Sequence, residues 1–145
     1  MFEKDQEIRP DLFQWNGPVS GEVLSQWLRR CGLRVPAELF ELWRRTGGGD
    51  LFETEVILSP FAAQGSGADV EGENKLHWGR GLPAEFLLFH FGSALSAVRQ
   101  ADGAWLVLNP KTYQVLEEHS TFADWYEHVN HDEFATRYGL GNDRR

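Results

Sequence analysis

The segment at residues 36–60, PAELFELWRRTGGGDLFETEVILSP, constrains the fold more than any other part of the chain. It begins with a proline, which suits the first turn of a helix because the missing N–H is not needed there. Leu42 and Trp43 belong to a broad apolar face on that helix. Gly47 can adopt the left-handed conformation that closes a helix, and residues 51–58 alternate as a strand does. The segment therefore predicts a helix, a tight reversal and a strand.

The triple glycine at 47–49 has a second interpretation, as a phosphate-binding loop. A P-loop needs its glycines between a strand and a helix, with a lysine at a fixed spacing. Here the glycines follow a helix and precede a strand, and no lysine stands at the required position. A helix cap followed by a chain reversal is therefore the favoured interpretation.

The remaining elements follow from apolar spacing and turn signals. An earlier helix is predicted from Ser20, a suitable cap, to Gly32. Apolar runs predict strands at 85–91, 94–100, 104–108 and 113–118. Asp102-Gly103 is a strong signal for a tight hairpin turn between the second and third of these strands. Thr121 opens a capping pattern before an aromatic-faced helix, and Asp132 starts a short final helix.

Strands bracketed by helices predict an α+β fold. We expect a mainly antiparallel sheet, with a mixed sheet as the alternative, flanked by an N-terminal helix pair and C-terminal helices. The length of 145 residues predicts a single domain over 1–145. Residues 1–19 are expected to be an irregular lead-in and 140–145 a frayed tail. Residues 61–83 look least regular, and a loop of that length is usually functional or mobile.

The charge balance limits the classes of partner. There are 14 basic and 22 acidic residues, a formal net charge of −8. This argues against binding nucleic acid or anionic membranes and is compatible with a basic protein partner; the alternative is that the charge only maintains solubility. The start of the chain, MFEKDQEIRP, has no apolar run like that of a signal peptide, so a cytoplasmic location is expected. Cys31 stands alone, which excludes an intrachain disulfide.

Three motifs, in order, resemble those of the SUKH superfamily over roughly residues 20–130. The first is Val35-Pro36 and an aromatic helix, followed by Thr46-Gly47-Gly48. The second is LFHFGS at 88–93, similar to the family's Phe-Phe-Gly strand end. The third is STFADW at 120–125, similar to the start of a late helix in the family. Two departures are the threonine where asparagine is common and the lack of a glycine at 94–98.

The resemblance implies a mixed sheet flanked by helices, without a cofactor or a conserved catalytic set. Bacterial members are often immunity proteins, which bind and neutralise a polymorphic or contact-dependent toxin, commonly a nuclease or deaminase. Eukaryotic relatives act as regulatory binding proteins. We therefore expect a protein-binding domain and not an enzyme, acting by stoichiometric occlusion of a basic toxin. A regulatory or scaffolding module is the alternative. The sequence does not indicate an oligomeric state.

The candidate partner-binding residues combine acidic groups with aromatic anchors. The acidic candidates are Glu53, Glu55, Asp69, Glu71 and Glu73, with Glu117 and Glu118 as a further acidic group. An anionic face would speed association with a basic partner, and aromatic side chains would carry most of the affinity. Trp78, in a glycine-flanked segment, is the preferred anchor, ahead of Trp15 and Tyr113. The alternatives are a solvated surface for the acidic residues and core packing for Trp15 and Tyr113.

Catalytic and metal-binding interpretations are weaker. A small hydrolase would use His90 or His119, and Ser93 could complete a triad, but no G-x-S-x-G motif supports this. His128 and His131 lie among carboxylates and could bind zinc. No third ligand stands at a fixed spacing from them, so surface solvation is favoured, and neither a metal nor a cofactor is expected.

Overall fold

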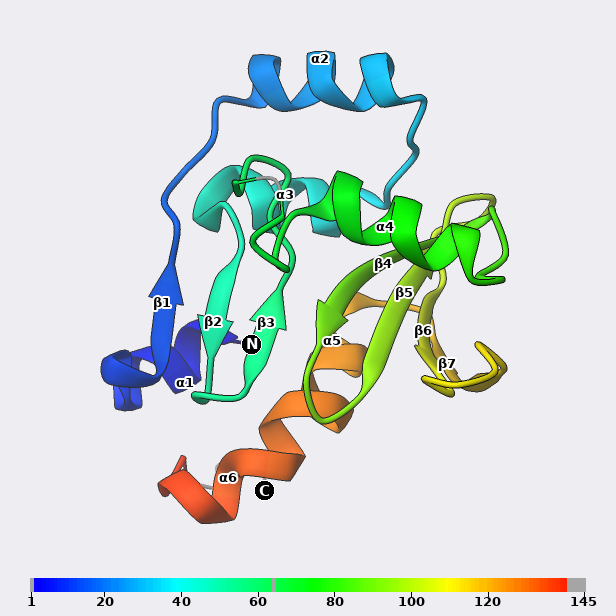
Figure 1. Cartoon of the computed structure of the whole chain (residues 1–145). Coiled ribbons are helices and arrows are strands. Elements are labelled where there is room, and N and C mark those ends of the chain that lie inside the picture. The colour runs from blue at the N-terminus through cyan, green and yellow to red at the C-terminus, as the bar shows by residue number, and fades with distance from the viewer. Residues whose placement is uncertain (1, 64, 141–145) are drawn as a thin grey trace.

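The computed structural model, which describes residues 2–63 and 65–140, is an α+β fold built on one sheet (Figure 1). Seven strands pair in the order in which they occur along the chain, and every pairing between them is antiparallel. The strands are β1 (Phe13–Trp15), β2 (Gly49–Leu51), β3 (Glu55–Ile57), β4 (Phe86–Phe91), β5 (Leu95–Arg99), β6 (Trp105–Leu108) and β7 (Val115–His119). The predicted α+β class is confirmed, and the sheet is antiparallel and not mixed.

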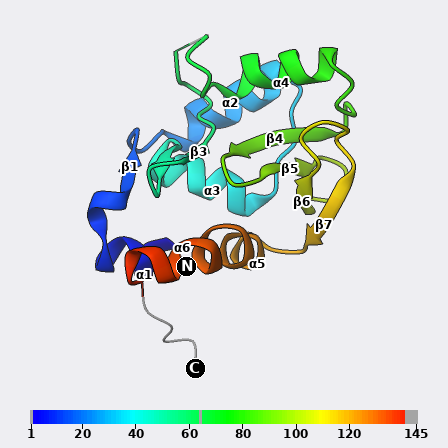
Figure 2. The ribbon, with the colours of Figure 1, turned by 60° about the horizontal axis from the view of Figure 1, so that its bottom comes forward.

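Helices pack around this sheet. They are α1 (Phe2–Ile8), η1 (Pro10–Leu12), α2 (Gly21–Cys31), α3 (Ala37–Thr46), α4 (Val70–Gly79), α5 (Phe122–Tyr126), η2 (Glu127–His131) and α6 (Asp132–Tyr138), with η2 in π-helical geometry. Figure 2 shows α1, α5 and α6 together on one side and α2 and α4 on the other. Among the described helices, none combines the length and the apolar character that crossing a bilayer requires.

The predicted N-terminal helix pair is confirmed together with its caps. The Ser20 hydroxyl caps the start of α2, and Gly32 closes that helix with a left-handed φ of 67°. Gly47 closes α3 in the same way, with a φ of 73°. Trp43 is fully buried, and its indole N–H donates to the Leu58 carbonyl over 2.8 Å. The aromatic face of α3 therefore holds this helix on the chain that leaves β3.

The triple glycine is a point of close backbone approach. A Cβ at Gly47 would collide with the carbonyl oxygen of Gly17, and a Cβ at Gly49 with that of Gln14 in β1. Gly49 also has a φ of 155°, which other residues rarely adopt. Because both obstacles are backbone atoms, they cannot move aside as a flexible side chain would. The interpretation as a helix cap and chain reversal is confirmed.

Substituting Gly49→Ala is expected to lower the free energy of unfolding by about 2–3 kcal/mol, because it adds both a backbone clash and a strained φ. Urea denaturation measures the difference. The control is Gly79→Ala at the end of α4, where an added Cβ meets no atom within 4 Å. That variant is expected to stay within about 0.5 kcal/mol of the parent. Equal stability of the two variants would contradict the close approach.

The single strand predicted at 51–58 is wrong, because the chain reverses within it. Phe52 and Glu53 have φ values of 52° and 68°, and the chain forms a β2–β3 hairpin around them. A left-handed conformation is unfavourable for a bulky residue. Phe52 is nevertheless fully buried, with its ring stacked 4.7 Å from that of Phe134. Tertiary packing thus stabilises a turn that carries no glycine signal.

Two segments expected to be irregular are folded. Residues 2–15 of the predicted lead-in form α1, η1 and β1, and β1 pairs with β2. Inside the predicted loop 61–83, Asp69 caps α4 by accepting a hydrogen bond from the Gly72 N–H over 2.8 Å. With Gly72 and Gly79 and few apolar residues, α4 shows little helical periodicity. Its acidic start was the one available signal.

The C-terminal helices agree with the prediction at their start and differ from it later. The Asp124 N–H donates to the Thr121 hydroxyl over 3.1 Å, as the capping pattern predicted. The final helix does not start separately at Asp132, because α5 continues through η2 into α6. Leu140 is buried, and the rest of the predicted frayed tail, 141–145, lies outside the described residues.

Candidate functional site

Trp78, the predicted aromatic anchor, is half-buried and is hydrogen-bonded to the backbone of β4. Within the described residues, the first half of β4 pairs with no strand on the β3 side, and α4 lies along that open edge. The fully buried Asn74 accepts from the Leu88 N–H over 2.6 Å and donates to the Leu88 carbonyl over 3.0 Å. One helical turn later, the Trp78 indole N–H donates to the Phe86 carbonyl over 2.9 Å. The contacts match because four helical residues and two strand residues both advance about 6 Å.

Substituting Trp78→Phe is expected to cost about 1 kcal/mol of stability, because the Phe86 carbonyl loses its donor at a poorly hydrated position. Thermal or urea denaturation measures this cost. Leu76→Ala on the same helix is the control, since Leu76 is 45% exposed and is expected to matter little. A Trp78→Phe variant as stable as the parent would show that the indole N–H is not part of the fold.

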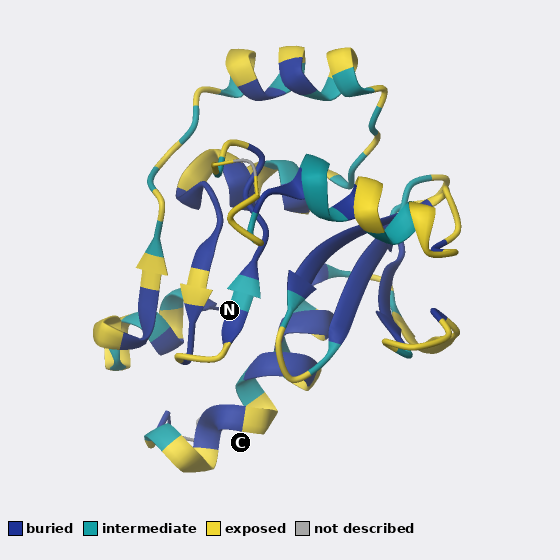
Figure 3. Cartoon of the chain, viewed as in Figure 1, coloured by how far each residue is buried: buried dark blue, intermediate teal, exposed yellow. Residues whose placement is uncertain are grey.

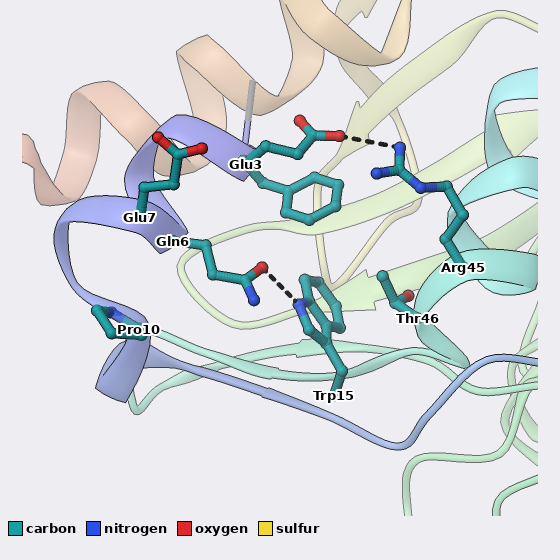
Figure 4. Close-up of a pocket in the computed structure, with 8 residues that line it drawn as sticks. Glu3, Gln6, Glu7, Pro10, Trp15, Arg45 and Thr46 are labelled. Atoms are coloured by element: carbon teal, nitrogen blue, oxygen red, sulfur yellow. Dashed lines mark hydrogen bonds and ion pairs between the residues drawn. The ribbon is translucent and has the colours of Figure 1, made fainter.

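The other two aromatic candidates, Trp15 and Tyr113, are also packed against other elements of the fold. Trp15 lies at a pocket of about 470 Å³, where its indole N–H donates to the Gln6 side chain over 3.0 Å (Figure 4). The centroid of its ring lies 5.3 Å from that of Phe2 in an edge-to-face arrangement, so Trp15 packs α1 against β1. Tyr113 is 8% exposed, and its hydroxyl lies 2.7 Å from His77 Nδ1 on α4. Tyr113 precedes β7 and does not belong to the strand predicted at 113–118.

The acidic candidates do not form one surface. Glu55 and Asp69 are only 1% and 3% exposed, so neither presents its carboxylate to a partner. Glu71 pairs with Lys75 over 3.3 Å on α4, where Glu73 is half-buried. Glu53 is exposed and accepts from the Tyr138 hydroxyl over 2.7 Å. Figure 1 places its β2–β3 turn and α4 at opposite ends of the strands.

His90, a candidate in the hydrolase hypothesis, lies in a Ser–His–Glu arrangement. Its Nδ1 is 2.9 Å from Ser96 Oγ, and its Nε2 is 2.8 Å from Glu55 Oε1. Serine hydrolases use this order of groups. Here Ser96 and His90 have no exposed surface, and the Trp125 indole N–H donates to Ser96 Oγ over 3.0 Å. A substrate could reach this hydroxyl only after α5 left the sheet, so the arrangement is a structural network.

The protonation of this network follows from its contacts. Burial lowers the pKa of His90 below its ordinary 6.5, although the hydrogen bond to Glu55 opposes the change. Burial acts to raise the pKa of Glu55, but hydrogen bonds from His90 and Ser93 outweigh it and hold the pKa below 4.5. A neutral imidazole with its proton on Nε2 donates to Glu55 and accepts from Ser96. Trp125 then donates to Ser96, so every donor has an acceptor.

These directions predict that stability falls on acidification. Below pH 6.5, His90 takes up a proton more readily in the unfolded chain than in the folded protein, because its folded pKa is lower. Below pH 4.5, Glu55 likewise takes up a proton more readily in the unfolded chain. Both contributions are present at neutral pH and are lost as the pH falls. Urea denaturation between pH 8 and 4 should show this slope. His90→Gln should flatten it, whereas the exposed His128→Gln should not; a slope unchanged in His90→Gln would contradict the assignment.

Most of the net charge lies in the segment 101–135, which contains β7, the last strand of the sheet. Residues 101–135 contain seven acidic residues and one basic residue, which is −6 of the formal charge of −8. Residues 115–118 are all exposed (Figure 3). A hollow of about 430 Å³ brings together Asp102, Glu118 and Asp124. We call β7 with Asp102, Glu117, Glu118 and Asp124 the acidic edge.

Two histidines extend the acidic edge from β7 onto the helix. His119 Nε2 lies 3.0 Å from Glu117, and its ring stacks 5.1 Å from that of His128. His128 Nδ1 donates to the Asp124 carbonyl over 2.8 Å, and this bond together with the nearby carboxylates raises its pKa. His131 instead bonds to Asp5 over 2.8 Å. No three His, Cys, Asp or Glu side chains in the described part of the chain are placed to hold a metal ion.

Exposed apolar side chains lie within the acidic edge. Glu117 pairs with Val107 and Val115 with Leu108, which leaves Leu116 between them as a β-bulge. Leu116 is 57% exposed and Val115 37%. Glu117 and Glu118 were expected from the sequence as an acidic group, whereas Leu116, Asp102 and Asp124 were not expected as site residues. The local excess of acidic residues at the end of a meander was the signal that could have found them.

No protein-family model matches the chain, and no curated protein is similar to it in sequence. The SUKH-like motifs therefore stand as a resemblance, and the structure gives each a physical role. Gly47 caps α3, and Thr121 caps α5. Gly92 has a φ of 153°, and a Cβ there would collide with the Glu55 carboxylate. The glycine of the second motif thus makes room for the buried network.

Proposed function

We propose that this chain is a cytoplasmic protein-binding domain that neutralises a basic partner by stoichiometric occlusion. The preferred partner is a toxin domain, such as a nuclease or deaminase, as the SUKH-like motifs suggest. The acidic edge is the observation that carries the proposal. Its carboxylates surround an exposed strand that bears two exposed apolar side chains.

In the proposed mechanism, the acidic edge occupies the basic groove in which the toxin binds its anionic substrate. Carboxylates at 117 and 118 steer the encounter and compete with the substrate for the same cationic groups. Leu116, at 57% exposure, supplies apolar area that excludes water once the complex has formed. Binding removes the toxin from its substrate without any reaction on this chain.

The buried Ser96–His90–Glu55 line does not favour a hydrolase. A nucleophile must be reachable by its substrate, whereas Ser96 has no exposed surface and is bonded to Trp125. A regulatory or scaffolding module is the second candidate, since the same acidic edge suits any basic partner. Gene neighbourhood separates the two roles, because a toxin gene next to this one favours neutralisation.

The proposal is tested by a pull-down with the protein encoded by the adjacent gene, followed by calorimetry. We expect a complex with one copy of each chain, an affinity that falls as salt is raised, and inhibition of the partner's activity. A partner that binds without losing activity would favour the regulatory role. Absence of binding, or binding that is independent of salt, would contradict occlusion by the acidic edge.

A further inference from the structure

We propose that β7 accepts an extended, basic segment of the partner as an additional strand of the sheet, an inference that rests on the function proposed above. In the described part of the chain, β7 pairs only with β6 and ends the strand order. An edge strand leaves about half of its backbone N–H and C=O groups unpaired and can template a further strand. The exposure of residues 115–118 means that no other described element covers this edge.

Charge identifies the kind of segment that fits. Glu117 and Glu118 are successive residues, so their side chains point to opposite faces of the sheet. Glu118 already pairs with Arg99 over 3.0 Å, and Glu117 lies 3.0 Å from His119. A strand with lysine or arginine on either face would therefore lie beside a carboxylate. Opposite charges on neighbouring strands stabilise the pairing.

The same charges disfavour a second copy of this chain on the edge. Two β7 strands paired about a twofold axis near residues 117 and 118 would bring the glutamates of the two copies together. Like charges directly opposite each other destabilise a sheet. The edge thus opposes self-association while it attracts a basic strand.

The test uses a synthetic peptide of alternating lysine and valine, together with two N-methylated versions. In a β-ladder only alternate amides of the added strand face the neighbouring strand. Methylating the amides of one set should weaken binding about tenfold or more, and methylating the other set should change it by less than about threefold. Fluorescence anisotropy measures the affinities. The variant Glu117→Lys/Glu118→Lys should weaken binding of the parent peptide by about tenfold.

Each other outcome has a definite meaning. If both methylated peptides bind as well as the parent peptide, charge alone holds them; the added strand is then excluded while the acidic edge and the proposed function stand. If no peptide binds, the added strand is likewise overturned, and the adjacent-gene pull-down still decides the function. If sedimentation shows that the free chain forms dimers through β7, the occupant is a second copy and not a basic partner.

Discussion

Replacing Glu55 with alanine is expected to lower the free energy of unfolding by about 3–5 kcal/mol, because it removes the acceptor of several hydrogen bonds and leaves a cavity. The carboxylate accepts from His90 over 2.8 Å and from the Ser93 N–H over 2.9 Å. Its loss leaves the buried His90 donor without an acceptor, removes the acceptor of the Ser93 N–H and opens a cavity beside Gly92. The effect is large because the whole Trp125–Ser96–His90 line ends on this one acceptor.

Urea denaturation of Glu55→Ala measures this cost. Glu85→Ala is the matched control, because it removes the same carboxylate from an exposed loop and should change stability by less than about 0.5 kcal/mol. Gly92→Ala is a second probe, since its Cβ would push against the same carboxylate. Equal stability of Glu55→Ala and Glu85→Ala would mean that the network contributes nothing.

Reversing charge in Glu117→Lys/Glu118→Lys is expected to slow association with the partner by about tenfold or more at low salt. It should also reduce the dependence of the association rate on ionic strength, because fewer favourable charge contacts remain to be screened. Both side chains are more than half exposed, so the fold should tolerate the change.

The matched control is Glu7→Lys/Glu22→Lys, which changes net charge equally but lies on α1 and α2. Stopped-flow mixing at two salt concentrations gives the association rates. The control should keep a rate within about threefold of the parent, since exposed charges more than a Debye length apart are largely screened. An equal loss in both double variants would assign the effect to overall charge and not to the acidic edge.

Local signals predicted much of the fold. Helix caps depend only on the neighbouring backbone, and they bounded the helices where expected. Ser20 caps the start of α2, and Gly32 and Gly47 close α2 and α3. Asp102-Gly103 marked its hairpin for the same reason. Strands were also expected at 85–91, 94–100, 104–108 and 113–118, close to the observed β4, β5, β6 and β7.

The errors lie where distant contacts decide the conformation. Phe52 turns the chain because its ring is buried against Phe134, a residue 82 positions away. The helix α4 forms along the open edge of β4, where Asn74 and Trp78 meet the strand backbone. Neither contact leaves a periodic pattern in the sequence.

The sequence predicted the acidic character of the candidate site but not its location. An acidic surface was expected, but composition cannot separate the buried Glu55 and the capping Asp69 from exposed carboxylates. Those two carboxylates serve the fold, and the exposed charge gathers instead around Glu117 and Glu118. Their place became visible only when β7 proved to be the free edge of the sheet.

The most direct test is hydrogen exchange of this chain, alone and in complex with the protein encoded by the adjacent gene. Binding through the acidic edge predicts slower exchange at residues 115–119 and 122–131, with little change in α2 and α4. Protection confined to α2 and α4, with β7 exchanging as in the free chain, would contradict the account.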